Sequence, residues 1–170
     1  MKPKRLISLL VAVCMMITML PLSAVTAFAE DTSSSPDPEE IVGDYKYAYT
    51  VNDGKATITK FLGPVDSEGN VDSTNNGPYN ITIPDKLGGC PVTGLGDHSF
   101  AAYPISIRDN YKNPLCSNIH SVTIPQSVTS IGYEAFCYCK NLQSLTLEGS
   151  IESMGDGAFA YCTSLTSLSL

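Results

Sequence analysis

Apolar positions in the second half of the chain recur with a period of 23 residues. Residues 122–144 read VTIPQSVTSIGYEAFCYCKNLQS, and residues 145–167 read LTLEGSIESMGDGAFAYCTSLTS. The positions that match are nearly all apolar or small. A period of about 20 to 29 residues is typical of repeat proteins in which each unit is one turn of a coil and neighbouring units bury one another's apolar faces. The pattern therefore predicts a mainly β solenoid.

A short apolar motif marks the strand of each unit. The pattern L-x-x-L-x-L, with Ile and Val replacing Leu in its first copy, begins at residues 119, 142 and 165 and is the core of leucine-rich repeats. Because alternate side chains of a strand point to opposite faces, Val122 and Ile124 are expected in the core and Thr123 in solvent. We expect these strands to stack as a short-stranded parallel sheet, with short helical or looped segments on the outer side.

A longer copy of the unit precedes the two regular ones. Residues 81–121 contain matches to the strand and turn of the repeat and also two insertions, around 88–91 and within 104–117. Insertions in repeat proteins are expected to form surface loops. The repeat region is therefore predicted to consist of units 81–121, 122–144 and 145–167, with residues 168–170 starting another unit.

Recurring side chains define the predicted core. Its members are Phe100, Phe136, Phe159, Cys139, Cys162, Leu142, Leu145 and Leu147. The phenylalanines are expected to stack, and the cysteines to be small buried residues, with Tyr103 in the cysteine's place in the expanded unit. Zinc is disfavoured because Cys137-x-Cys139 has only one intervening residue. A disulfide between Cys90 and Cys116 is left open.

These positions resemble the BspA-like leucine-rich repeat family, through the pattern I-P-x-x-V-T-x-I-G-x-x-A-F-x-x-C-x-x-L-x-S. Residues 45–82, with the run Y-x-V-N-D-G-x-A-T-I-T, are similar to the amino-terminal region that such proteins often have. The resemblance implies a secreted or surface protein of a host-associated microbe that binds host or partner proteins. It does not imply which ligand is bound.

Residues 1–29 are expected to be a cleaved signal peptide. A basic start, an apolar run over residues 6–20 and an A-x-A site at residues 27–29 follow one another. An uncleaved membrane anchor is the alternative, and Pro21 disfavours it by interrupting the apolar run. No other segment has the roughly 18 apolar residues that span a bilayer. The mature chain is therefore expected to be secreted or at the cell surface, without a membrane span.

The next segments are predicted to be a linker and a cap. Residues 30–43 are acidic and poor in apolar side chains, which favours a disordered linker. Residues 44–80 are expected to form a β-hairpin cap, because tyrosines alternate along residues 45–49 and Asn52-Asp53-Gly54 supplies turn residues. Such a hairpin would cover the core edge of the first coil. A tyrosine face that stacks on carbohydrate is the alternative.

The loop at residues 66–72 has side-chain oxygens at alternate positions, a pattern that suggests a calcium site. However, Val71 stands where the loop of an EF-hand needs Gly. A solvated loop is therefore the expectation, with a weak cation site as the alternative.

Charge and missing motifs exclude several functions. Without residues 1–29 the chain keeps seven basic and seventeen acidic residues, a net charge of about −10, which disfavours nucleic acid as a partner. His98 and His120 occupy variable repeat positions, and the motifs G-x-S-x-G, H-E-x-x-H and G-x-x-x-x-G-K do not occur. We therefore expect no catalysis, no metal and no cofactor.

Two surfaces are candidates for binding. The first is a polar ladder on the concave face of the sheet, where repeat proteins usually bind; it consists of Thr82, Thr123, Thr146 and Ser169, flanked by Gln126, Gln143 and Glu148. Threonine also simply suits an exposed strand. The second is the long insertion, which gathers Arg108, Asp109, Tyr111 and Lys112.

The sequence thus predicts a non-catalytic leucine-rich-repeat protein that mediates protein binding or adhesion outside the cell. The alternative is a repeat or targeting module of a longer secreted protein that has a catalytic or wall-binding domain elsewhere. No polar capping segment follows the strand at residues 168–170. Because uncovered strand edges are normally protected, we expect either continuation of the repeats or self-association through this edge.

Overall fold

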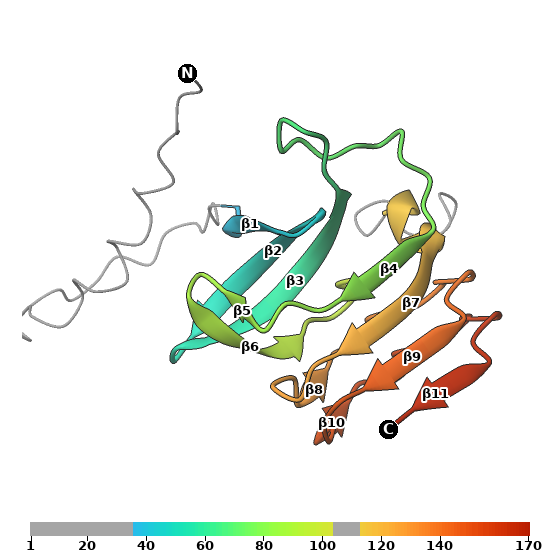
Figure 1. Ribbon diagram of the computed structural model, residues 1–170. Coiled ribbons are helices and arrows are strands. Elements are labelled where there is room, and N and C mark those ends of the chain that lie inside the picture. Colours follow the sequence, from blue (N-terminus) through green and yellow to red (C-terminus); the bar gives the residue numbers. More distant parts are fainter. Residues whose placement is uncertain (1–35, 104–112) are drawn as a thin grey trace, which may run out of the picture. The chain divides into compact units, whose positions relative to one another are not determined.

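Each regular repeat contributes one strand to each of two sheets (Figure 1). The computed structural model describes residues 36–103 and 113–170. The first sheet, here called the repeat sheet, is parallel and has the order β11-β9-β7-β4. Its strands are β4 (Tyr79–Thr82), β7 (Ile119–Ile124), β9 (Ser144–Leu147) and β11 (Ser167–Ser169).

The second sheet joins the repeats to the amino-terminal hairpin and is here called the mixed sheet. Its order is β1-β2-β3-β6-β8-β10, with β5 paired to β6. The strands are β1 (Glu39–Val42), β2 (Tyr45–Asn52), β3 (Lys55–Pro64), β5 (Lys86–Leu87), β6 (Cys90–Leu95), β8 (Ser130–Ile131) and β10 (Ser153–Met154). The outer side, predicted to be short helices or loops, thus carries short strands, while the 3₁₀ helix η2 (Pro114–Asn118) precedes β7.

The register of the repeat sheet follows the 23-residue period. Val122 pairs with Leu145, which pairs with Leu168, and apolar side chains between the sheets form one core that extends from the hairpin to the last unit. Gly132 and Gly155 recur because successive turns approach closely. A Cβ at Gly155 would lie 2.4 Å from the backbone nitrogen of Tyr133, which is too close for any other residue.

Four phenylalanines form a column through this core. Phe61, Phe100, Phe136 and Phe159 stack in that order, with centroid separations of 5.4, 4.8 and 5.2 Å. Phe100 and Phe136 are fully buried, and Phe159 is partly buried. The sequence period does not include Phe61, because it lies in the hairpin. The hairpin therefore imitates a preceding repeat unit.

Side-chain donors run parallel to this column. The Cys139 thiol donates to the carbonyl of Phe100 and the Cys162 thiol to that of Phe136, each at 3.1 Å. Asn113 Nδ2 donates to the carbonyl of Phe61. Asn113 therefore takes the cysteine's hydrogen-bonding role in the expanded unit. Tyr103, which has the cysteine's place in the sequence, packs with Ala101 and Cys137 instead. Cys90 and Cys116 are both free thiols, so the open disulfide does not form.

The amino-terminal boundaries differ from those expected. Residues 39–42 form β1, which pairs antiparallel with β2, so the folded part begins before the predicted linker end at residue 43. The signal peptide and residues 30–35 of that linker lie outside the described residues. In β2, Tyr47 and Tyr49 are buried and Tyr45 packs against the core, as the alternation predicts, whereas Val51, beside the turn, is exposed. The turn at Asp53 and Gly54 has the positive φ angles expected of it.

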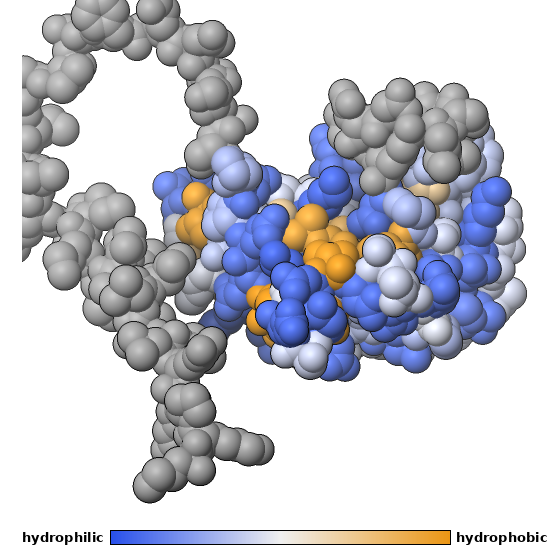
Figure 2. Space-filling view, turned by 90° about the horizontal axis from the view of Figure 1, so that it is seen from above, coloured by the Kyte–Doolittle hydropathy of each residue, from blue (hydrophilic) through white to orange (hydrophobic). Residues whose placement is uncertain are grey.

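Figure 2 shows one face of the molecule, which is largely hydrophilic around a central group of apolar residues. Among the described residues, no helix is long and apolar enough to cross a membrane.

Candidate functional site

The outward face of the repeat sheet carries two rows of short, uncharged polar side chains. The first row is Thr82, Thr123, Thr146 and Ser169, and the second is Asn80, Ser121, Ser144 and Ser167. Members of a row are direct partners on adjacent strands, which lie about 4.8 Å apart. The parallel register therefore brings together residues that are 23 or 41 positions apart in the chain.

The chemistry of this face is that of hydroxyl and amide groups. The Ser121 hydroxyl donates to Asn80 Oδ1 at 2.7 Å, and each hydroxyl can donate one hydrogen bond and accept others. Because the side chains are short and carry no charge, a partner can approach closely without removing water from a charge. The face can bind a polar surface of a partner that aligns with its two rows. It contains no nucleophile with a base beside it.

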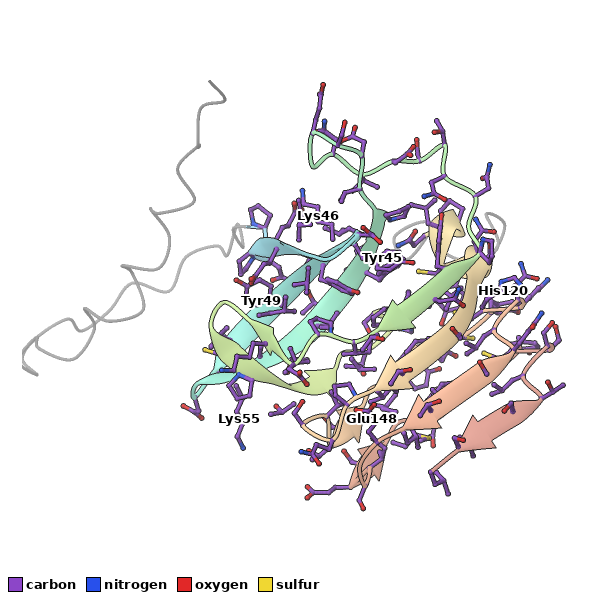
Figure 3. All side chains as sticks on the ribbon, in the orientation of Figure 1. Tyr45, Lys46, Tyr49, Lys55, His120 and Glu148 are labelled. Atoms are coloured by element: carbon purple, nitrogen blue, oxygen red, sulfur yellow. The ribbon has the colours of Figure 1, made fainter. Side chains whose placement is uncertain are left out.

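The predicted flanking residues lie at the ends of β9. Gln143 immediately precedes this strand and Glu148 immediately follows it, and both are exposed. Figure 3 labels Glu148 at one end of the repeat sheet and His120, at the start of β7, at the other. The predicted residues of the long insertion, Arg108, Asp109, Tyr111 and Lys112, lie outside the described part of the chain.

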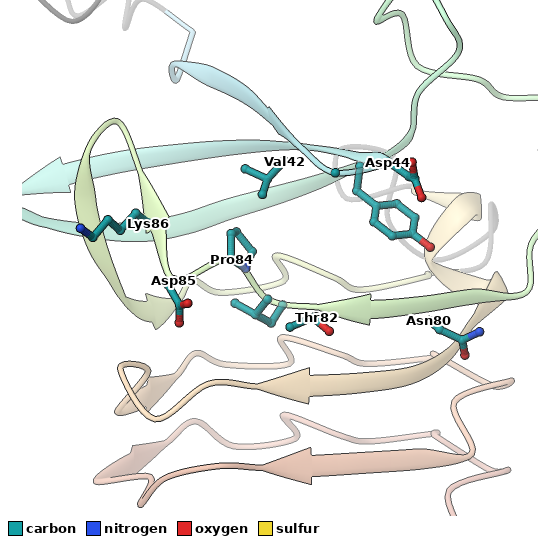
Figure 4. A pocket seen from close by; sticks show the side chains of 10 residues that line it. Val42, Asp44, Asn80, Thr82, Pro84, Asp85 and Lys86 are labelled. Carbon is teal, nitrogen blue, oxygen red and sulfur yellow. The ribbon is translucent and has the colours of Figure 1, made fainter.

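A groove lies beside the repeat sheet, along the outer edge of β4. It has a volume of about 460 Å³, and Figure 4 shows that side chains from β4 and from the β1–β2 turn line it. Tyr45, the first residue of β2, also lines it, with its hydroxyl facing the backbone of Asn80. Burial raises the pKa of Tyr45, so the hydroxyl stays protonated at neutral pH. Sequence reasoning missed this groove because no motif marks it.

The turns on the outer side hold His98 in a hydrogen-bonded network. Its Nδ1 lies 3.0 Å from the Tyr103 hydroxyl, which donates to Glu134. The Tyr133 hydroxyl donates to the same carboxylate at 2.9 Å. His98 and Glu134 share a repeat position and have positive φ angles of 56° and 50°. The network therefore ties adjacent turns together and offers a structural role for His98.

Buried thiols lie along the core rather than in a reactive site. Burial raises the pKa of Cys139, with smaller contributions from neighbouring thiols, and raises that of Cys162 to about 11. A thiol that stays protonated is a poor nucleophile and a poor metal ligand. Among residues 36–103 and 113–170, no cluster of three potential metal ligands occurs.

The loop at residues 66–72 uses its oxygens internally. The Asp66 carboxylate accepts the backbone N–H groups of Glu68 and Asn70, each at 2.9 Å. These bonds lower the pKa of Asp66, and bonds from Thr74 likewise lower that of Asp72. The carboxylates therefore stabilise turns, as expected of a solvated loop.

Comparison with known families confirms the resemblance. Residues 105–170 match the sequence model of the family described as BspA type Leucine rich repeat region (6 copies). No match was found among curated proteins.

Solved structures of leucine-rich repeat proteins are similar to this chain. A leucine rich cell surface protein from Faecalibacterium prausnitzii is 30% identical with a TM-score of 0.52, over 80% of this chain and 31% of that protein. The chain thus spans about a third of that protein's length. A leucine-rich repeat protein from Bacteroides capillosus is 24% identical with a TM-score of 0.43, over 77% of this chain and 96% of the other.

Proposed function

Because residues 105–170 carry BspA-type leucine-rich repeats, we propose that this chain is a non-catalytic secreted or cell-surface protein that binds a protein partner through the repeat sheet. The observation that carries the proposal is the pair of polar rows, aligned strand by strand on one exposed face. Parallel repeat proteins present such faces as extended binding surfaces. Adhesion to a host or matrix protein is the role that this surface would serve.

The proposed location has two supports. The similar protein from Faecalibacterium prausnitzii is named a cell surface protein, and residues 1–29 have the order of segments found in signal peptides. Mass spectrometry of the exported protein should give a chain that begins at Glu30. A chain that retains residues 1–29 would contradict cleavage.

Arginine substitutions on the repeat sheet test the binding surface. Changing both Thr123 and Thr146 to Arg adds two long charged side chains to adjacent strands, and should abolish binding to partners found on an array of host and matrix proteins. The control changes Ser153 and Thr163, which are exposed outside the repeat sheet, to Arg. Full binding by the Thr123 and Thr146 variant, with unchanged melting, would remove this face from consideration.

A second candidate function is a targeting module within a longer secreted protein. It is favoured by the fact that the chain spans only 31% of the similar cell surface protein. Sequencing the gene and its downstream region would test it, since a catalytic or wall-binding domain in the same reading frame is expected.

A further inference from the structure

The backbone of β4 is open on the side that faces the groove. Within the described sheet, β4 has β7 as its only partner strand. The N–H of Ile83 donates to the carbonyl of Thr123, and alternate residues of a strand direct their backbone groups to opposite sides. The N–H and carbonyl of Thr82 therefore point away from β7. Such unpaired groups are a template for a further strand.

Only a short part of this edge is open. The Tyr45 hydroxyl faces the backbone N–H of Asn80, and Pro84 has no N–H to offer. The open groups are therefore centred on Thr82, which is exposed. A segment of a few extended residues could pair with them, whereas a long strand would meet Tyr45 at one end and Pro84 at the other.

The charge of the groove selects among such segments. Asp44 from the β1–β2 turn and Asp85 from the segment between β4 and β5 both line it, and both are exposed. Neither forms an ion pair within the described part of the chain, and Lys86 adds one positive charge. The excess of negative charge is complementary to a basic side chain. The volume of about 460 Å³ lies within the range of ligand sites.

We propose that this groove, here called the edge groove, binds an extended peptide segment of a partner protein, which pairs with Thr82 and places a Lys or Arg side chain near Asp44 and Asp85. The inference rests on the proposed function, because it specifies how a protein partner is held. Main-chain hydrogen bonds would provide affinity and the two carboxylates would provide specificity, as in other cases of strand addition.

A synthetic peptide tests the chemistry directly. The probe is a labelled, end-capped heptapeptide of sequence TVTKTVT, titrated with the full chain while fluorescence anisotropy is measured. Two matched peptides serve as controls, one with Glu in place of Lys and one with an N-methyl group on the central backbone nitrogen. Saturable binding of the Lys peptide is expected, with about tenfold weaker binding of either control. Absence of saturable binding of the Lys peptide, or equal binding of all three, would overturn the proposal.

Substitutions in the protein locate the site. Thr82→Pro removes the open N–H without touching the bonds to β7, and should weaken binding of the Lys peptide about tenfold. The N–H of Ser167 donates to Gln143 in front of β9, so by the same alternation the N–H of Leu168 points away from β9 at the opposite edge of the same sheet. Leu168→Pro is therefore the matched control and should leave binding unchanged. Asp44→Asn together with Asp85→Asn should weaken the Lys peptide and not the Glu peptide. The peptide controls do not depend on how any variant folds.

Binding of the variants to the partner found on the array distinguishes this inference from the proposed function. If Thr82→Pro weakens that partner as it weakens the peptide, the edge groove is supported. If Thr123→Arg with Thr146→Arg abolishes partner binding and Thr82→Pro leaves it unchanged, the repeat sheet remains the site and the edge groove is overturned. If neither variant weakens the partner, both proposals fall.

Discussion

Single side chains at fixed places of the repeat determine how well successive units fit together. Ala135 and Ala158 occupy one such place and are buried, whereas the expanded unit has Ser99 there, also buried. The Ser99 hydroxyl has no hydrogen-bond partner among the described residues. A buried polar group without a partner is destabilising by about 1 to 3 kcal/mol.

Ser99→Ala should therefore stabilise the protein. Restoring the alanine of the other units removes the unpaired hydroxyl, so the free energy of unfolding should rise by about 1 kcal/mol in urea denaturation. Ser153→Ala, at an exposed position, is the control and should change it little. A loss of stability on Ser99→Ala would mean that the hydroxyl has a partner.

The buried thiols should lower the stability of the folded chain at alkaline pH. The pKa of Cys162 is raised to about 11 in the folded chain by burial, whereas an unfolded cysteine has a pKa of about 8.5. Between these values the folded state holds a proton that the unfolded state has lost, so stability is full below about pH 8.5 and falls as pH rises toward 11. Denaturation midpoints measured from pH 7 to 11 should show a smaller decline for Cys162→Ser. The same decline in both proteins would contradict a contribution from this thiol.

At the scale of elements, the amino-terminal hairpin works as an additional repeat unit. The N–H of Phe61 donates to the carbonyl of Ser99 at 2.7 Å, as that of Phe100 donates to Ala135 at 2.8 Å. The carbonyl of Phe61 is in turn held by Asn113. The hairpin thus continues both the hydrogen-bond ladder and the aromatic column, and covers the first unit by imitating it.

Asn113→Ala should weaken the attachment of the expanded unit to the hairpin. It leaves the Phe61 carbonyl without its donor inside the core, so the free energy of unfolding should fall by about 1 to 3 kcal/mol. Asn141 donates to the carbonyl of Ser117 at 2.8 Å at an exposed site, and Asn141→Ala is therefore a matched control with a smaller expected loss. Equal losses in chemical denaturation would indicate that Asn113 has no special role.

The 23-residue period predicted the repeats, but it does not extend into the hairpin. The strands around Val122 and Leu145 follow from a spacing that recurs, and their register places the polar rows side by side. Phe61 belongs to no recurring pattern, and Asn113 replaces a thiol with a chemically different donor, so neither could be aligned. The edge groove depends on where the β1–β2 turn meets β4, which is a contact between segments that share no sequence period.

At the scale of the whole molecule, the last unit in the sequence presents apolar side chains that earlier units bury. Leu168 is 60% exposed and its partner Leu145 4%, while Met154 is 51% exposed and its partner Ile131 2%. Each of these pairs is matched in register on adjacent strands. The outer edges of β10 and β11 are also unpaired within the described sheets. Apolar surface beside open strand edges is normally covered, either by a further repeat unit or by another chain.

We therefore expect purified residues 30–170 to self-associate. Light scattering should give a mass above that of the monomer, rising with concentration, because association buries Leu168 and Met154 and pairs open backbone groups. Changing both residues to Lys should shift the protein to a monomer, since charged residues at a sheet edge oppose pairing. Val51→Lys together with Val71→Lys, which changes exposed apolar residues away from this end, is the control and should leave association intact. A wild-type chain that stays monomeric at high concentration would show that this end of the molecule needs no cover.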